Sequence, residues 1–156
     1  MTITAMVILE RCRVAEREMR MIGEKAARYR DATQRITSTL DGVGSRATGE
    51  TDRMAAMLAE IDELDRRYVS RQREYTAELA AACSLLDMLP SMECSILNRY
   101  YVRREPLKAI AVALGYSYGY VRSCKGEACA RLATIPEGVI LGLLPSWYIE
   151  DEKRQR

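Results

Sequence analysis

The chain of 156 residues carries 24 basic and 22 acidic side chains, which gives a formal net charge of +2. This length fits one or two small domains, and so small a net charge is by itself no argument for a nucleic-acid partner. Histidine is absent. Its absence excludes most zinc sites and the Ser-His-Asp and Cys-His nucleophile arrangements, so we expect no enzyme, no metal and no cofactor.

The five cysteines form no CxxC pair. Free cysteines in a chain that shows no signal peptide and no lipidation signal are typical of the reducing cytosol. The apolar start, MTITAMVILE, is too short to cross a membrane. We therefore expect a cytoplasmic protein with no membrane partner.

The first predicted element is a long helix that ends near residue 40. Apolar or small residues recur there at alternating spacings of four and three, which is the heptad pattern of helices that pair with other helices. They are Ile8, Cys12, Ala15, Met19, Ile22, Ala26, Tyr29, Thr33, Ile36 and Leu40. Between residues 8 and 40 the other residues include seven arginines and four glutamates.

A loop is predicted at 41–51, because this stretch holds three glycines and several small polar residues. Thr51 is expected to cap a second long helix over 52–89, which continues the same spacing with Arg71 and Glu78 as polar breaks. The apolar stripe of this helix consists of Met57, Ile61, Leu64, Tyr68, Tyr75, Ala82, Leu85 and Leu89.

The two long helices are expected to fold back on each other as an antiparallel, coiled-coil-like hairpin over residues 1–89. Residues 1–40 carry eight bases and five acids, whereas residues 41–89 carry six bases and ten acids. These opposite balances favour the pairing. An intermolecular coiled coil that uses the same stripes is the alternative, and a homodimer is compatible with the hairpin.

Three shorter helices are predicted over residues 90–133. Pro90-Ser91 is expected to end the long helix and cap a support helix over 92–103. Pro106 suits the first turn of a helix over 107–114, Gly115-Tyr116 forms a turn, and Ser117 caps a helix from 118 to about 132. The expected core residues of the support helix are Ile96, Leu97, Tyr100 and Tyr101.

The last two of these helices read as a helix-turn-helix. Ala111 lets the helices pack closely, Gly115 makes the tight turn and Val121 buries the second helix. The rest of the apolar underside is Ile110, Leu114 and Leu132. The exposed positions that remain are those that a recognition helix lays in a DNA major groove, namely Ser117, Tyr118, Gly119, Arg122, Ser123 and Lys125.

Arg122 is the strongest candidate for reading a base, because one arginine can bond O6 and N7 of guanine together. Tyr118 would touch a thymine methyl group or a phosphate, and packing as a first-turn aromatic is its alternative. Ser117, as the cap, would leave the neighbouring amides facing a phosphate. Double-stranded DNA is therefore the expected partner.

Basic residues concentrate in the same region, since residues 90–133 hold seven bases and three acids. Phosphate contacts position a protein on DNA without specifying the sequence that it reads. The residues that fit such contacts are Lys125, Arg103, Arg104 and Lys108. For each of them an ordinary solvated charge is the alternative.

Residues 134–156 form a tail that is first apolar and then charged. Its apolar members are expected either to pack on the rest of the chain or to form a docking strip for a second subunit or partner. They are Val139, Leu141, Leu143, Leu144, Trp147 and Tyr148. A homodimer through this tail belongs to the second alternative.

The stretch LPSMECSILNRYYVRREPLKAIAVALGYSYGYVRSCKGEACARL resembles the helix-turn-helix of region four of bacterial sigma factors. The matching residues are Ile96, Arg99, Tyr100, Ile110, Ala111, Leu114, Gly115, Ser117, Val121, Arg122, Ala128 and Leu132. The whole chain is also similar to the sigma-like, ArpU/RinA-type phage transcriptional regulators. This resemblance implies control of phage genes in a bacterial host cell, through promoter DNA and RNA polymerase.

The chain departs from sigma factors in two ways. It shows no sign of the region that melts the promoter, and it places Tyr118-Gly119-Tyr120 where sigma factors more often have charged residues. Two other functions remain as alternatives: a DNA-recognition subunit for packaging, similar to a small terminase, and a coiled-coil interaction or inhibitor protein that no longer binds DNA.

Overall fold

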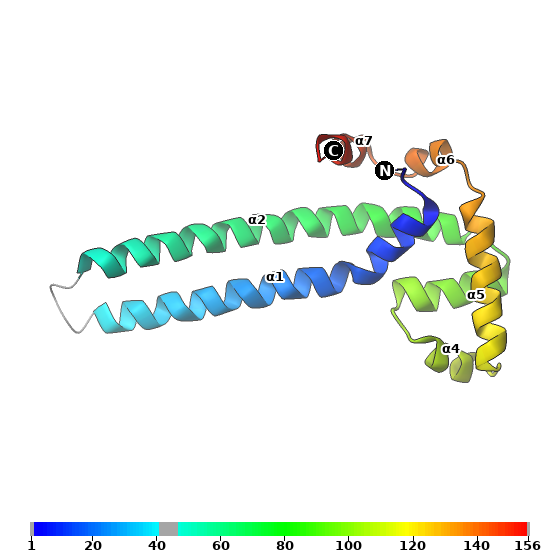
Figure 1. The fold of residues 1–156 in the computed structure, drawn as a ribbon, viewed down its shortest axis with the longest axis horizontal. Helices are drawn as coiled ribbons and strands as arrows, with labels where there is room; N and C mark the ends of the chain where they lie inside the picture. Colours follow the sequence, from blue (N-terminus) through cyan, green and yellow to red (C-terminus); the bar gives the residue numbers. More distant parts are fainter. Residues whose placement is uncertain (1, 41–46, 156) are drawn as a thin grey trace. The chain divides into compact units, whose positions relative to one another are not determined.

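The computed structural model describes residues 2–40 and 47–155, and every regular element in these ranges is helical. The expected all-α class is therefore confirmed. Figure 1 follows the elements along the chain. They are α1 (Ala5–Leu40), α2 (Ala47–Leu86), α3 (Ser91–Leu97), the π-helix η1 (Asn98–Val102), α4 (Leu107–Leu114), α5 (Tyr118–Ala133), α6 (Glu137–Gly142) and α7 (Ser146–Arg154).

Contacts divide the chain into two compact units, each of which contains part of α1 and part of α2. The larger unit comprises Met1–Ala15 and Arg73–Arg156, and the smaller unit comprises Glu16–Gln72. The boundaries that the sequence suggests at 89 and 133 follow motifs rather than packing, and they stay predictions.

In the smaller unit, α1 and α2 run side by side in opposite directions (Figure 1). Glu18, early in α1, pairs with Arg71 at 2.6 Å, and Arg30, later in α1, pairs with Asp65 at 2.6 Å. Among the described residues of this unit, the buried apolar side chains all belong to the two predicted stripes, and they are Met19, Ala26, Ile61 and Leu64. The heptad spacing therefore identifies the contact face of both helices.

The bounds of α2 differ from the prediction at both ends. Residues 41–46 of the expected loop lie outside the described residues, but residues 47–51 are helical, so Thr51 lies within the helix and is not its cap. This segment is followed by alanine, glutamate, arginine and methionine, which are strong helix formers and carry the helix over Gly49. At the other end α2 stops at Leu86, because Pro90 disfavours helical backbone at the residue before it.

The core of the larger unit joins segments that are distant in the sequence. Its members come from the start of α1, the end of α2, the helices that follow, and the C-terminal tail. Those that are at most 2% exposed include Ile8, Leu9, Leu85, Leu86, Leu97, Tyr101, Leu132, Ile140 and Tyr148. Burial of so many large apolar side chains supplies most of the driving force for folding this unit.

The tail packs within the chain. Three side chains of the tail are buried in the core of the larger unit: Ile140 in α6, Leu144 between α6 and α7, and Tyr148 in α7. Val139, by contrast, is 44% exposed. Of the two alternatives for the apolar residues of the tail, internal packing is thus the one observed for these three buried side chains.

A buried polar network fixes α7. The Tyr148 hydroxyl donates to Oε1 of Glu78 at 2.8 Å, and the Arg11 guanidinium donates to the Tyr148 oxygen and to Glu152. Burial raises the pKa of Tyr148, as does the carboxylate of Glu78. Burial acts to lower the pKa of Arg11, but its bonds to Glu152 and Tyr148 raise it above its usual value.

Candidate nucleic-acid interface

Residues 91–133, here called the head, contain α3, η1, α4 and α5 around a small core of their own. Ile96 of α3, Ile110 and Ala111 of α4, and Val121 of α5 are all at most 4% exposed and pack together. Ala111 and Val121 thus occupy the buried positions that their spacing predicts. This core holds α5 so that its opposite face points to solvent.

The connection between α4 and α5 is set by local sequence. Gly115 ends α4 with φ +73°, in the left-handed region that glycine adopts without strain. Ser117 then caps α5, because its side chain accepts a hydrogen bond from the backbone N–H of Tyr120 at 3.2 Å. As a result the first turn of α5 begins at Tyr118, in agreement with the sequence-based bounds.

The support helix differs from the prediction in two respects. Pro90, not Ser91, occupies the N-cap position, and no side chain caps α3. After Leu97 the helix widens into η1, where the N–H of Arg103 donates to the carbonyl of Asn98. Tyr101 is 1% exposed, and its ring meets that of the half-buried Tyr100 edge-on at 4.8 Å.

The predicted DNA contacts on the first half of α5 share an exposed surface. Gly119, Arg122 and Ser123 are all exposed and follow helical i, i+3, i+4 spacing, so they lie on one face. A Cβ atom added at Gly119, or at Gly126 one heptad later, would meet no atom within 4 Å. Among the described residues, no close neighbour requires a glycine at either position.

Three of the seven bases of the head pair with acidic side chains. Arg99 and Arg103 both pair with Glu105, at 3.1 and 3.4 Å, and Arg131 pairs with Glu93 at 3.2 Å. Arg103, one of the predicted phosphate contacts, is thus exposed but lies beside an acidic side chain.

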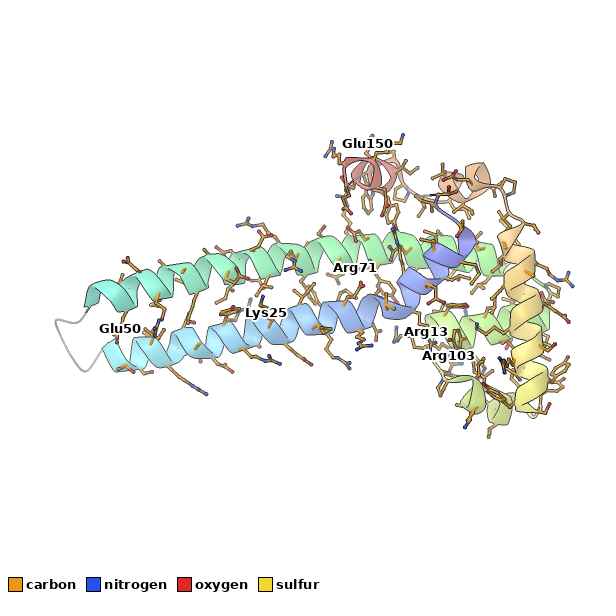
Figure 2. The ribbon with its side chains drawn as sticks, viewed as in Figure 1. Arg13, Lys25, Glu50, Arg71, Arg103 and Glu150 are labelled. Carbon is orange, nitrogen blue, oxygen red and sulfur yellow. The ribbon has the colours of Figure 1, made fainter. Side chains whose placement is uncertain are left out.

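Two further bases lie against aromatic rings. The Nζ atom of Lys125 lies 4.6 Å from the ring centroid of Tyr100. The guanidinium of Arg13, from α1, covers the same ring at 3.7 Å, and Figure 2 labels both Arg13 and Arg103. Lys125 is half-buried by this packing, so only part of its charge faces solvent.

The remaining predicted contacts differ in exposure. Lys108 in α4 and Arg122 in α5 are exposed, and within the described ranges neither makes an ion pair or ring contact. Arg104 is half-buried with φ +57°. Among the predicted DNA contacts, Lys108 and Arg122 are thus the exposed bases without an ion pair within the described residues.

Sequence reasoning did not include Tyr116 and Tyr120 among the candidate contacts. Their rings stack at 4.8 Å between centroids, and they are 44% and 45% exposed beside the equally exposed Tyr118. A hydrogen bond with Cys124 raises the pKa of Tyr120 above its usual value. The signal in the sequence is the alternating GYSYGY at 115–120, which brings three tyrosines to one helix start.

Two kinds of site find no support in the described ranges. No cluster of three or more potential metal ligands occurs among these residues. Likewise, no helix within residues 2–40 and 47–155 combines the length and the apolar character needed to span a bilayer.

Comparison of the chain with protein-family models, curated proteins and solved structures finds no match. The functional interpretation therefore depends on the residues and geometry described above.

Proposed function

We propose that this protein is a sequence-specific DNA-binding transcriptional regulator of phage or prophage genes. In this proposal the head is a sigma-region-four-like helix-turn-helix that follows a helical hairpin. The observation that carries it is the start of α5, where a left-handed Gly115 and a capping Ser117 present an exposed Arg122 on a face of small side chains.

The proposed binding mode places the first two turns of α5 in the major groove. Arg122 pairs with O6 and N7 of a guanine, and Ser123 lies beside it as a secondary contact. The amides at the helix start, with Ser117, face a phosphate. Gly119 lets the helix backbone approach the base edges.

Phosphate contacts are few in this account. Lys108 is the exposed base of α4, while Arg103, Arg104 and Lys125 contribute less because they are paired or partly buried. Each neutralised phosphate adds about −0.9 to the slope of log affinity against log salt concentration. We expect a slope of about −2 to −3 for one head, which is shallow for a DNA-binding protein.

RNA polymerase and a second copy of the chain are the further partners in this proposal. One head reads only a few base pairs, and two heads in a homodimer would suit a palindromic or repeated site. The dimer contact is proposed on the helical hairpin or on the exposed side of the tail. Contact with polymerase would supply the remaining affinity at a promoter.

The neutralised bases of the head favour one second candidate, an interaction or inhibitor protein that does not bind DNA. The ion pairs of Arg99, Arg103 and Arg131 lower the positive potential that DNA binding needs. Absence of any salt-dependent affinity for DNA would favour this candidate.

The primary test is binding of the purified full chain to duplexes from its own genomic neighbourhood, followed by fluorescence anisotropy over a salt series. Arg122→Ala should weaken specific binding by about tenfold or more, as expected for loss of a bidentate base contact. Arg67→Ala, at an exposed position of α2, makes the same change of charge and should leave binding within twofold. Equal effects of the two substitutions would contradict the proposed reading residue.

A second test adds a large side chain to the proposed interface and leaves its charge unchanged. Gly119→Leu puts a large side chain on the face of α5 that should enter the groove, where the structure has open space for it. DNA affinity should fall at least tenfold without loss of stability, since leucine is a better helix former than glycine. Gly49→Leu in α2, also in open space, is the matched control. Unchanged binding by Gly119→Leu would remove this face of α5 from the interface.

A further inference from the structure

Three tyrosines gather at the start of α5 and stay largely outside the core. Tyr116, Tyr118 and Tyr120, here called the tyrosine patch, are 44%, 45% and 45% exposed. Val112 of α4, which is 84% exposed, adds a further apolar side chain near the same turn. Tyr116 and Tyr120 stack on each other, whereas Tyr118, two positions before Tyr120, projects from another side of the helix start. Several exposed apolar groups at one helix start mark a contact surface more often than a single one does.

The fold does not need these rings for its own packing. The core beneath them is filled by Ile110 and Val121, each with no exposed surface. The ring of Tyr116 stacks on that of Tyr120, whose hydroxyl is held by Cys124 one turn further along α5. These two rings therefore have a contact within the head, while Tyr118 occupies the first position of α5 and is exposed.

We propose that the tyrosine patch reads thymine, by packing its rings against thymine 5-methyl groups in the major groove of double-stranded DNA. This inference rests on the proposed function, because it requires α5 to enter that groove. The thymine methyl is the one apolar group that the base pairs present there, and apolar side chains are its usual contacts.

The position and charge of the patch favour this ligand. It lies at the end of α5 that carries Ser117 and precedes Arg122 by about one turn, so guanine and thymine contacts would follow each other along one site. Among the predicted DNA contacts, Lys108 and Arg122 are the exposed bases without an ion pair within the described residues, so we expect phosphate attraction to be weak. Discrimination between sequences depends on the base contacts, which are the guanine contact of Arg122 and the apolar contacts of the patch.

The expected size of the effect follows from burial of one methyl group, which changes affinity by about fourfold. The full chain is used to select binding sites from a randomised duplex library. The selected duplexes are then resynthesised with deoxyuridine in place of thymidine, which removes only the 5-methyl groups. Wild-type affinity should fall about fourfold for each contacted thymine.

Two variants assign the effect to the patch. The thymines are replaced one at a time. For at least one contacted thymine, Tyr118→Ala should bind the thymine duplex and the uracil duplex with nearly equal affinity. Tyr118→Phe keeps the ring and should preserve the difference between the two duplexes. Tyr29→Ala in α1, which is far from the head in sequence, should behave as wild type.

The outcomes separate the inference from the function on which it rests. If selection yields a sequence but thymine and uracil duplexes bind equally, the thymine inference is overturned and DNA binding stands. If the single strand of the selected sequence binds more tightly than the duplex, the patch stacks on unpaired bases and the inference is also overturned. If selection yields no sequence at all, the proposed function fails, and the inference fails with it.

Discussion

The two compact units bury their side chains in different ways although the same heptad spacing runs through both. In the smaller unit, the apolar side chains buried within the described residues come from two helices only, and Leu64 is the most buried of the large ones. The larger unit combines residues from both ends of the chain, such as Ile8, Leu132 and Tyr148. A regular apolar stripe thus predicts which face of a helix packs against another helix. How completely its side chains are buried depends on how many segments of the chain meet there.

This comparison predicts that core substitutions have their largest effects in the larger unit. Leu97→Ala removes a side chain with no exposed surface and should lower the free energy of unfolding by about 2–5 kcal/mol. Leu64→Ala in the smaller unit, at a leucine that is 1% exposed but packed between two helices only, should cost less than Leu97→Ala. Urea denaturation followed by circular dichroism measures both. Similar losses in the two variants would break the comparison.

A smaller effect is expected at the polar network of α7. Tyr148→Phe removes the hydroxyl that donates to Glu78 and should cost about 1.5–3 kcal/mol, because a buried hydrogen bond to a charged group is lost. Tyr29→Phe in the smaller unit, at a partly exposed tyrosine, is the matched control and should be nearly neutral. The two variants are compared by thermal and urea unfolding.

The same hydroxyl should make stability depend on pH. The folded-state pKa of Tyr148 is raised, so the neutral phenol stabilises the fold at every pH below the usual tyrosine pKa of 10. This contribution is lost as the pH rises above about 10, where the unfolded chain releases the proton more readily than the folded chain does. Wild-type stability should therefore fall more steeply than that of Tyr148→Phe above about pH 10. Parallel curves would contradict the role of the buried phenol.

The smallest effect is expected for the ion pairs between the two helices of the smaller unit. Arg30→Ala breaks the half-exposed pair with Asp65 and should cost only about 0.2–1 kcal/mol, since exposed pairs are weak. High salt should reduce the difference from wild type. A loss of several kcal/mol, unaffected by salt, would show that charge rather than the stripe holds these helices together.

Local sequence was sufficient to place α4 and α5. Pro106, Gly115 and Ser117 each act on the backbone next to them, and the observed bounds agree with the prediction. The stripes were equally informative, since their spacing identifies the buried faces of α1 and α2. Thr51 and Ser91 were misjudged because a capping residue type does not fix where a helix begins.

Contacts between distant segments could not be predicted. Glu78 reads as a polar break in an apolar stripe, yet it is 1% exposed and bonded to Tyr148 in the tail. The sequence likewise shows the excess of bases in the head but not that Glu105 pairs with both Arg99 and Arg103. Which bases are left without an acidic partner depends on such pairings, and composition does not give them.

Amide hydrogen exchange, with and without a selected DNA duplex, tests the central claim most directly. It compares the head with the smaller unit in one experiment, on the unmodified full chain. We expect slower exchange over residues 115–126 when the duplex is bound, and little change over residues 16–40 and 47–72. Protection of α1 and α2 in the smaller unit, with none at the start of α5, would contradict the assignment of the DNA interface to the head.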